Sequence, residues 1–126
     1  MKNHELIQVV ERLIRAGCSY RIDDLKDIYA SDLVIHILQE DSSLQTFDYE
    51  ENLHFFRSMR DSGAPPLDST AFFNLAEVQD GVGFVVVTRT MNQGSGPKTI
   101  VFSLMLRETP EGWKVFREQA VIVGDA

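Results

Sequence analysis

The second half of the chain alternates long runs of β-forming residues with short turn-forming segments. This pattern restricts the fold more than any other feature. Four runs are expected to be strands, at residues 72–79, 82–92, 98–108 and 113–123. Asp80-Gly81 joins the first two runs and is a strong hairpin signal, because both central residues of such a turn need a positive φ. Since all the connections are short, the sequence predicts a four-strand antiparallel meander.

The first half of the chain has helical periodicity instead. Between residues 4 and 16, apolar side chains recur at intervals of three and four, and Gly17 is expected to end this helix. Asp23 and Asp24 can cap the start of a short second helix. Residues 33–38, rich in branched side chains, then predict an early strand.

A third helix is predicted at residues 49–61. Asp48 and Glu51 have the spacing of a capping box at its start. Pro65 and Pro66 follow its end, and proline cannot continue a helix because it lacks the amide donor. Helices followed by strands predict a single α+β domain over the whole chain, residues 1–126.

Composition restricts the partners and the compartment. The chain has 19 acidic and 12 basic residues, a net charge of −7, so we expect no nucleic-acid partner and no membrane partner. Cys18 is the only cysteine, which excludes an intrachain disulfide. No apolar run approaches the roughly 18 residues that span a bilayer. These features favour a soluble, cytoplasmic protein.

The last hairpin determines which side chains share a face of the sheet. If Pro110 and Glu111 form its two-residue loop, Ser103 lies opposite Glu118. Both faces of this strand pair are then largely apolar, and helices can cover only one of them. We therefore expect a homodimer through the second face. That face carries Ile100, Phe102, Leu104 and Leu106.

Glu118 is the strongest candidate for catalysis. The expected register places it on the pocket face, where an acid among apolar side chains has a raised pKa and can serve as a general acid or base. Two alternatives are a structural glutamate that hydrogen-bonds Ser103 or a helix group, and an exposed glutamate if the register slips. The residues expected to bind the ligand beside Glu118 are Tyr29, Ser103, Met105, Arg107 and Phe116.

The remaining polar residues give no sign of a metal or cofactor. His4, His36 and His54 are isolated in the sequence and Cys18 has no partner, so no metal and no cofactor are expected. His36 should face away from the pocket. Five acids between residues 40 and 51 would favour a cationic or neutral ligand if they surround the pocket entrance. A solvated loop and helix start, which also suits the helix dipole, is the preferred explanation of these acids.

Two segments resemble a known superfamily. DLKDIYASDLVIH at residues 24–36 and LRETPEGWKV at residues 106–115 resemble passages of the nuclear transport factor 2-like superfamily, which includes SnoaL-like polyketide cyclases and ketosteroid isomerases. The resemblance implies a single SnoaL-like domain with a cystatin-like cone. In that fold, three N-terminal helices pack on a curved, mixed, mostly antiparallel β-sheet, and the open end of the cone leads to a pocket.

The resemblance implies a ligand site without a steroid isomerase. The three catalytic positions of ketosteroid isomerases align with Leu13, Ile37 and Met105, which can neither abstract a proton nor donate a hydrogen bond. We expect a small hydrophobic ligand and acid/base chemistry of the cyclase, isomerase or hydratase type. The alternative is a non-catalytic dimerisation or interaction module with a filled cone, and a pocket of roughly 300 Å³ or more would favour the first.

Overall fold

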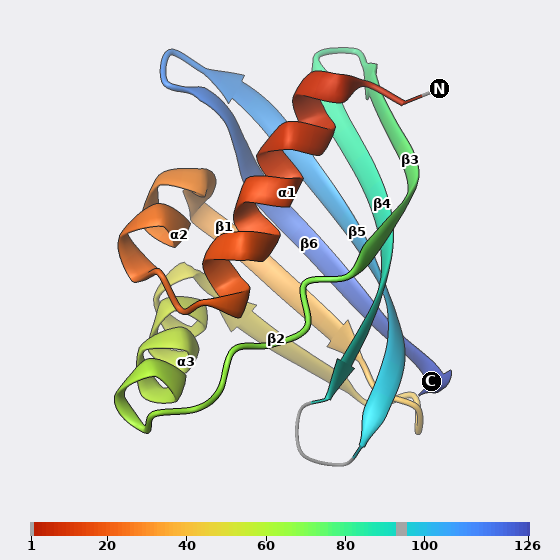
Figure 1. The fold of residues 1–126 in the computed structure, drawn as a ribbon. Coiled ribbons are helices and arrows are strands. Elements are labelled where there is room, and N and C mark those ends of the chain that lie inside the picture. Colours follow the sequence, from red (N-terminus) through yellow and green to blue (C-terminus); the bar gives the residue numbers. More distant parts are fainter. Residues whose placement is uncertain (1, 93–95) are drawn as a thin grey trace.

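The computed structural model describes residues 2–92 and 96–126, and in these the chain forms three helices and one six-stranded sheet (Figure 1). The elements in chain order are α1 (His4–Cys18), α2 (Ile22–Ile28), β1 (Tyr29–Leu38), β2 (Leu44–Asp48), α3 (Tyr49–Asp61), β3 (Ala71–Gln79), β4 (Val82–Asn92), β5 (Pro97–Thr109) and β6 (Gly112–Asp125). The turn expected at residues 93–97 lies partly outside the described residues. No helix of the described part is both long and apolar enough to cross a membrane.

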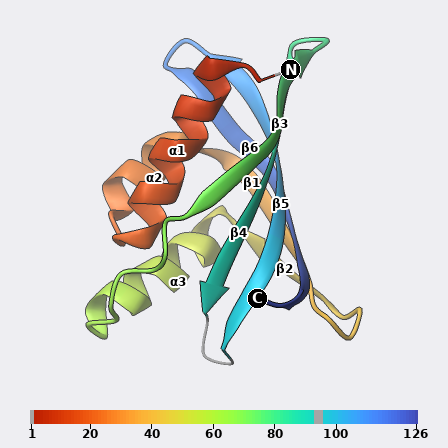
Figure 2. The same cartoon turned by 45° about the vertical axis from the view of Figure 1, so that its right-hand side comes forward.

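The sheet is open and strongly curved, with the strand order β2-β1-β6-β5-β4-β3. Every neighbouring pair is antiparallel except β1 and β6, which run parallel. All three helices lie on the concave side, as Figures 1 and 2 show. These features confirm the α+β class and the three N-terminal helices on a mixed, mostly antiparallel sheet.

The element ends follow local chemistry, with two corrections. The Asp48–Glu51 capping box is present at the start of α3, as expected. α1 continues past Gly17 to Cys18, so the glycine does not end it, and Tyr20 takes the positive φ of 55° beyond the helix. α2 begins at Ile22, so Asp23 and Asp24 do not cap it but lie in its first turn. Their negative charges interact favourably with the helix dipole there.

The early strand is longer than expected and has a partner that sequence analysis missed. β1 begins at Tyr29, directly after α2, and has an irregularity before Val34. β2 pairs with it antiparallel, from Val34 opposite Asp48 to Leu38 opposite Leu44. The two strands place the residues that precede α3 at one edge of the sheet.

A β-bulge in the last hairpin changes the expected register. Near the turn, Thr109 lies opposite Gly112 and Arg107 opposite Lys114, as predicted. Between Leu106 and Met105 the register shifts by one residue, and beyond it Leu104 rather than Ser103 lies opposite Glu118. A bulge reverses the alternation of side chains on one strand, so residues on either side of it exchange faces relative to a regular ladder.

The predicted dimer face is therefore wrong. Ile100, Leu104 and Leu106 are only 3%, 2% and 0% exposed, because they point to the concave side beneath the helices. Phe102 lies with them against the same core. The convex face of β5 instead carries Met105, which is 40% exposed.

Candidate functional site

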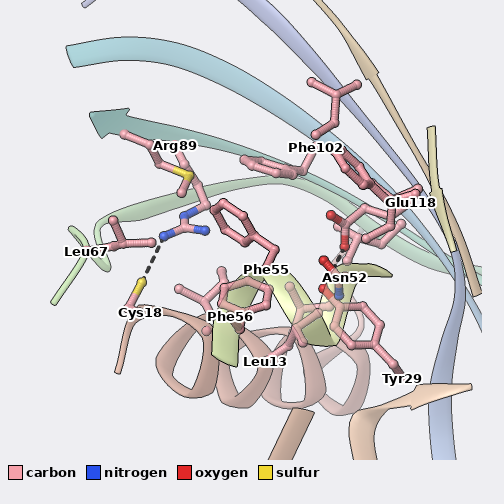
Figure 3. Close-up of a pocket in the computed structure, with 18 of the residues that line it drawn as sticks. Leu13, Cys18, Tyr29, Asn52, Phe55, Phe56, Leu67, Arg89, Phe102 and Glu118 are labelled. Carbon is pink, nitrogen blue, oxygen red and sulfur yellow. Dashed lines mark hydrogen bonds between the residues drawn. The ribbon is translucent and has the colours of Figure 1, made fainter. Parts of the chain in front are cut away.

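The open end of the concave side holds a cavity of about 200 Å³ between the sheet, α1 and α3 (Figure 3). Its walls are mostly apolar, but three buried polar side chains also line it. Asn52, Arg89 and Glu118 are 8%, 9% and 8% exposed, and they are the buried polar or charged residues among those that the structure describes. All of them border this one cavity, which therefore is the candidate functional site.

Glu118 owes its position on the cavity wall to the bulge in β6. The Tyr29 hydroxyl donates a hydrogen bond to its Oε1 over 3.2 Å. Burial raises the pKa of Glu118 to about 7, while the Tyr29 hydrogen bond and the Arg89 charge act in the opposite direction. A carboxyl group with this pKa exchanges protons readily at neutral pH.

Tyr29 stands at the first position of β1, directly after α2, and lies at the base of the cavity. Its pKa lies well above the ordinary value, because burial and then the neighbouring Glu118 disfavour the phenolate. The hydroxyl thus remains protonated and serves as a donor. Its single proton is directed at Glu118, so Tyr29 holds that carboxyl group in place.

Asn52 comes to the cavity from α3, whose start is fixed by the capping box. Phe55 and Phe56 follow at three and four residues, the spacing of one helix face, and both also line the cavity. The Asn52 Nδ2 has no hydrogen-bond partner within the described residues. Asn52 adjoins the Tyr29 hydroxyl, whose pKa it lowers, but its Nδ2 makes no hydrogen bond of good geometry there. A buried amide donor without a full partner is costly and rare in folded proteins, so this group has capacity for a ligand acceptor.

Arg89 comes from β4, where it continues the inward-facing positions of Val85 and Val87. Its Nη2 donates to the Asp68 carbonyl oxygen over 2.7 Å and to the Cys18 Sγ over 3.1 Å. The Arg89 Nε has no partner among the described residues. The guanidinium carbon lies 5.7 Å from the centre of the Phe102 ring.

The predicted site residues divide into two groups. Tyr29 and Glu118 line the cavity, whereas four others do not. The exceptions are Ser103, Met105, Arg107 and Phe116, and their assignment to the pocket was wrong because the bulge puts Glu118 on the face opposite to theirs.

Arg107 illustrates the difference between the two faces. It forms an ion pair with Asp32, with both nitrogen–oxygen distances at 3.0 Å, and its guanidinium lies 4.3 Å from the centre of the Phe116 ring. His36 also faces away from the cavity, as expected, with its Nδ1 2.9 Å from the Thr46 hydroxyl.

Of the three positions compared with ketosteroid isomerases, Leu13 and Ile37 line the cavity and Met105 does not. The inward-facing cavity residues of β5 are Phe102 and Leu104, which are equally unable to act as acids. Within residues 2–92 and 96–126, no three His, Cys, Asp or Glu side chains gather in a group suited to a metal ion.

Sequence analysis missed Arg89 and Asn52. Arg89 had a signal, since a charged residue interrupts the apolar positions 85, 87 and 91 on one face of a predicted strand. Asn52 had a weaker one, its helical spacing to Phe55 and Phe56. Neither pattern identifies a pocket without knowledge of which faces meet.

Comparison with solved structures identifies the architecture, although the sequence matches no protein-family profile and no curated protein. An NTF2-like protein from Cytophaga hutchinsonii superposes with a TM-score of 0.76 at 15% identity, covering 98% of this chain and 100% of that one. A candidate dehydratase of the NTF2-like family from Streptomyces avermitilis gives 0.70 at 16%, covering 95% and 94%. An NTF2-like protein of unknown function in nutrient uptake from Rhodospirillum rubrum gives 0.68 at 20%, covering 94% and 98%. The chain therefore has the nuclear transport factor 2-like fold.

Proposed function

We propose that the cavity binds a small, largely apolar molecule with a carbonyl group, and that Glu118 moves a proton on this ligand. This is acid/base chemistry of the cyclase, isomerase or hydratase type found among SnoaL-like proteins. The observation that carries the proposal is a buried carboxyl group with a pKa of about 7 on the wall of a cavity that also contains an unpartnered amide donor.

Each polar group has a defined role in this proposal. The Asn52 Nδ2 donates a hydrogen bond to the ligand carbonyl oxygen and stabilises the negative charge that develops there. The Glu118 carboxylate takes a proton from the adjacent carbon and returns it elsewhere on the ligand. Tyr29 orients Glu118 through its hydrogen bond and does not itself contact the reacting atoms.

The polar lining favours this function over a non-catalytic module with a filled cone. The cavity of about 200 Å³ is smaller than the 300 Å³ that would favour a ligand site on size alone. However, an interior that only supports the fold would pair its buried polar atoms. The unpartnered Asn52 Nδ2 and Arg89 Nε point to a small ligand instead.

Steroid isomerisation stays excluded from the proposal. A cavity of about 200 Å³ is smaller than the range that usually holds drug-sized ligands. The compared positions Leu13, Ile37 and Met105 supply no acid or base, and neither does Leu104, a β5 residue that lines the cavity. Incubation with a Δ5-3-ketosteroid should therefore give no turnover above the buffer rate.

Deuterium exchange tests the proposed chemistry without knowledge of the natural substrate. The protein is incubated in D2O with small ketones such as cyclohexanone, and deuterium at the carbon beside the carbonyl is measured by NMR. Glu118→Gln keeps the shape and should lower the protein-dependent exchange about 10²- to 10⁴-fold. Glu108→Gln, at an exposed position on β5, is the matched control. Equal exchange by wild type and Glu118→Gln would overturn the proposal.

We also propose a homodimer, through the convex face rather than the face expected from the sequence. Phe72 and Met105 are 64% and 40% exposed there, and Phe84 pairs with Met105 across the strands. No helix within the described chain covers this face. A second copy would bury its apolar side chains over more than about 1,000 Å².

Light scattering tests the dimer and should give about twice 14.3 kDa, and Met105→Glu should shift this to the monomer mass. A wild-type monomer at micromolar concentration would contradict the dimer.

A further inference from the structure

Arg89 carries a buried positive charge without an ion-pair partner in contact, although its charge acts at longer range on the carboxyl groups of Asp68 and Glu118. No carboxylate of the described residues lies within ion-pair distance of its guanidinium. Its two hydrogen-bond partners, the Asp68 carbonyl and the Cys18 sulfur, are neutral acceptors. Burying an unpaired charge costs several kcal/mol, and folded proteins normally offset this with an anion.

Arg89 lines the cavity, and its hydrogen-bonding capacity is only partly used. Nη2 makes both hydrogen bonds, which leaves the Nε proton without an acceptor in the described part of the chain. The two Nη2 hydrogen bonds hold the guanidinium in one orientation, and its carbon lies 5.7 Å from the centre of the Phe102 ring. Because both Nη2 protons are engaged, a ligand carboxylate would meet Arg89 through its charge and a single charge-assisted hydrogen bond rather than through a two-pronged contact.

Arg89 and the Glu118 group occupy different ends of the cavity. In Figure 3, Arg89 lies beside Leu67 and Cys18, and Glu118 lies with Asn52 and Tyr29 on the other side. The register agrees, because Arg89 pairs with Ile100 and Glu118 with Leu104, four residues further along β5. A single ligand can thus have its anionic group at one end and its reacting carbon at the other.

The acidic residues between positions 40 and 51 do not oppose an anionic ligand. Glu40 forms an ion pair with Lys98, Asp41 accepts hydrogen bonds from Ser43, and Asp48 and Glu51 form the capping box. None of the five acids lines the cavity. The solvated loop and helix start, the simpler of the two interpretations made from the sequence, accounts for them.

We infer that the ligand is a small carboxylic acid with an apolar body, bound with its carboxylate on Arg89. This inference rests on the proposed function and narrows it to one substrate class. Cavity size favours a carboxylate over a larger phosphate ester, and the apolar walls of the open end suit a single ring or short chain.

Paired probes test the inference. Phenylacetate and its neutral counterpart phenylacetamide are titrated into isotope-labelled protein at about pH 6, where Glu118 is largely uncharged and the probe acid is ionised. Shifts of the backbone amides that border the cavity give each Kd. Phenylacetate should bind about tenfold more tightly or better, because a hydrogen bond to a charged group is the stronger one.

Variants assign the preference to Arg89. Arg89→Met keeps an unbranched side chain and removes the charge, so the preference for phenylacetate should disappear. Arg12→Met removes an exposed arginine from α1 and should leave the preference unchanged. Without a probe, the Arg89→Met variant should melt at the same temperature as the wild type or at a higher one, because the substitution removes a buried charge that has no ion pair. The Asp68 carbonyl loses its hydrogen bond from Arg89, but Asp68 is exposed and water can replace that donor.

The outcomes separate the inference from the proposed function. Equal binding of acid and amide, or an acid preference that survives Arg89→Met, overturns the inference and leaves the proposed function standing. A large loss of melting temperature in Arg89→Met also overturns it, because Arg89 is then a structural brace. If neither probe shifts the cavity amides at millimolar concentration, both the inference and the proposed ligand site are wrong.

Discussion

The two ends of the concave face differ although they belong to the same strands. At the closed end, near the β3–β4 and β5–β6 turns, α1 packs directly on the sheet and Val85, Leu106 and Val115 have no exposed surface. At the open end, inward positions further along the same strands are Arg89, Phe102 and Glu118, which line the cavity. The closed end holds the fold together, and the open end keeps buried polar groups whose hydrogen-bonding capacity the described chain satisfies only in part.

The contrast teaches how a small domain combines stability with a ligand site. Apolar packing at the closed end supplies most of the free energy of unfolding. Truncation of a tightly packed aliphatic side chain lowers this free energy more than truncation elsewhere. Unsatisfied polar groups at the open end lower the free energy of unfolding. A functional site is therefore expected at the open end, where buried polar groups reduce the stability that apolar packing would give.

The largest expected effect comes from a pair of leucines on β5. Leu106→Ala, in the closed end, should lower the free energy of unfolding by about 2 to 5 kcal/mol. Leu104→Ala, on the cavity wall, should cost at least about 1 kcal/mol less, since it enlarges a space that already exists and opens no new void. Urea unfolding measures both. Equal losses would show that the two ends are packed alike.

The next effect is the pH dependence that Glu118 imposes on stability. Its pKa is about 7 in the folded chain and about 4.5 when unfolded. Between these values the folded state keeps a proton that the unfolded state has released, so stability falls as pH rises through this window. The loss amounts to about 3 kcal/mol above pH 7. The Tyr29 hydroxyl contacts Glu118 directly, Asn52 adjoins Tyr29, and the Arg89 charge acts on Glu118 from the other end of the cavity.

Glu118→Gln isolates this contribution. The variant cannot ionise, so its free energy of unfolding should exceed that of the wild type at pH 8, and the two should converge towards pH 4. Chemical denaturation across the pH range provides the comparison. A glutamine variant that is less stable than wild type at pH 8 would mean that the Glu118 carboxylate is a satisfied structural group.

The smallest expected effect concerns the contact between α1 and the sheet. A Cβ on Gly83 would lie 2.8 Å from the Leu6 Cδ2 and 3.3 Å from the Leu106 Cβ. Gly83→Ala should therefore cost about 1 to 3 kcal/mol through overpacking. Gly124→Ala, where a Cβ meets nothing within 4 Å, should change stability by less than about 0.5 kcal/mol. A neutral Gly83→Ala would show that the closed end has room to adjust.

Most of the fold is predictable from the sequence, because strand alternation, the Asp80-Gly81 turn and the capping box are local signals. The site depends on a feature that is not local. The bulge at Phe116 alone places Glu118 opposite Leu104. No glycine or other turn-forming residue marks the position of this bulge in the sequence. Glu118 was assigned to the correct face of β6 while its expected neighbours on β5 were assigned to the wrong one.

The most direct test of the site is the titration of Glu118 itself. With ¹³C-labelled glutamate, the Glu118 carboxyl carbon is followed by NMR as the pH is changed, and Glu118→Gln identifies the signal by its loss. Burial on the cavity wall predicts a midpoint of about 7. Addition of phenylacetamide, which places no new charge beside the group, should still perturb the signal by contact. A midpoint near the ordinary value of 4.5 would mean that water solvates this carboxyl group, and would contradict an acid/base site at the open end of the cone.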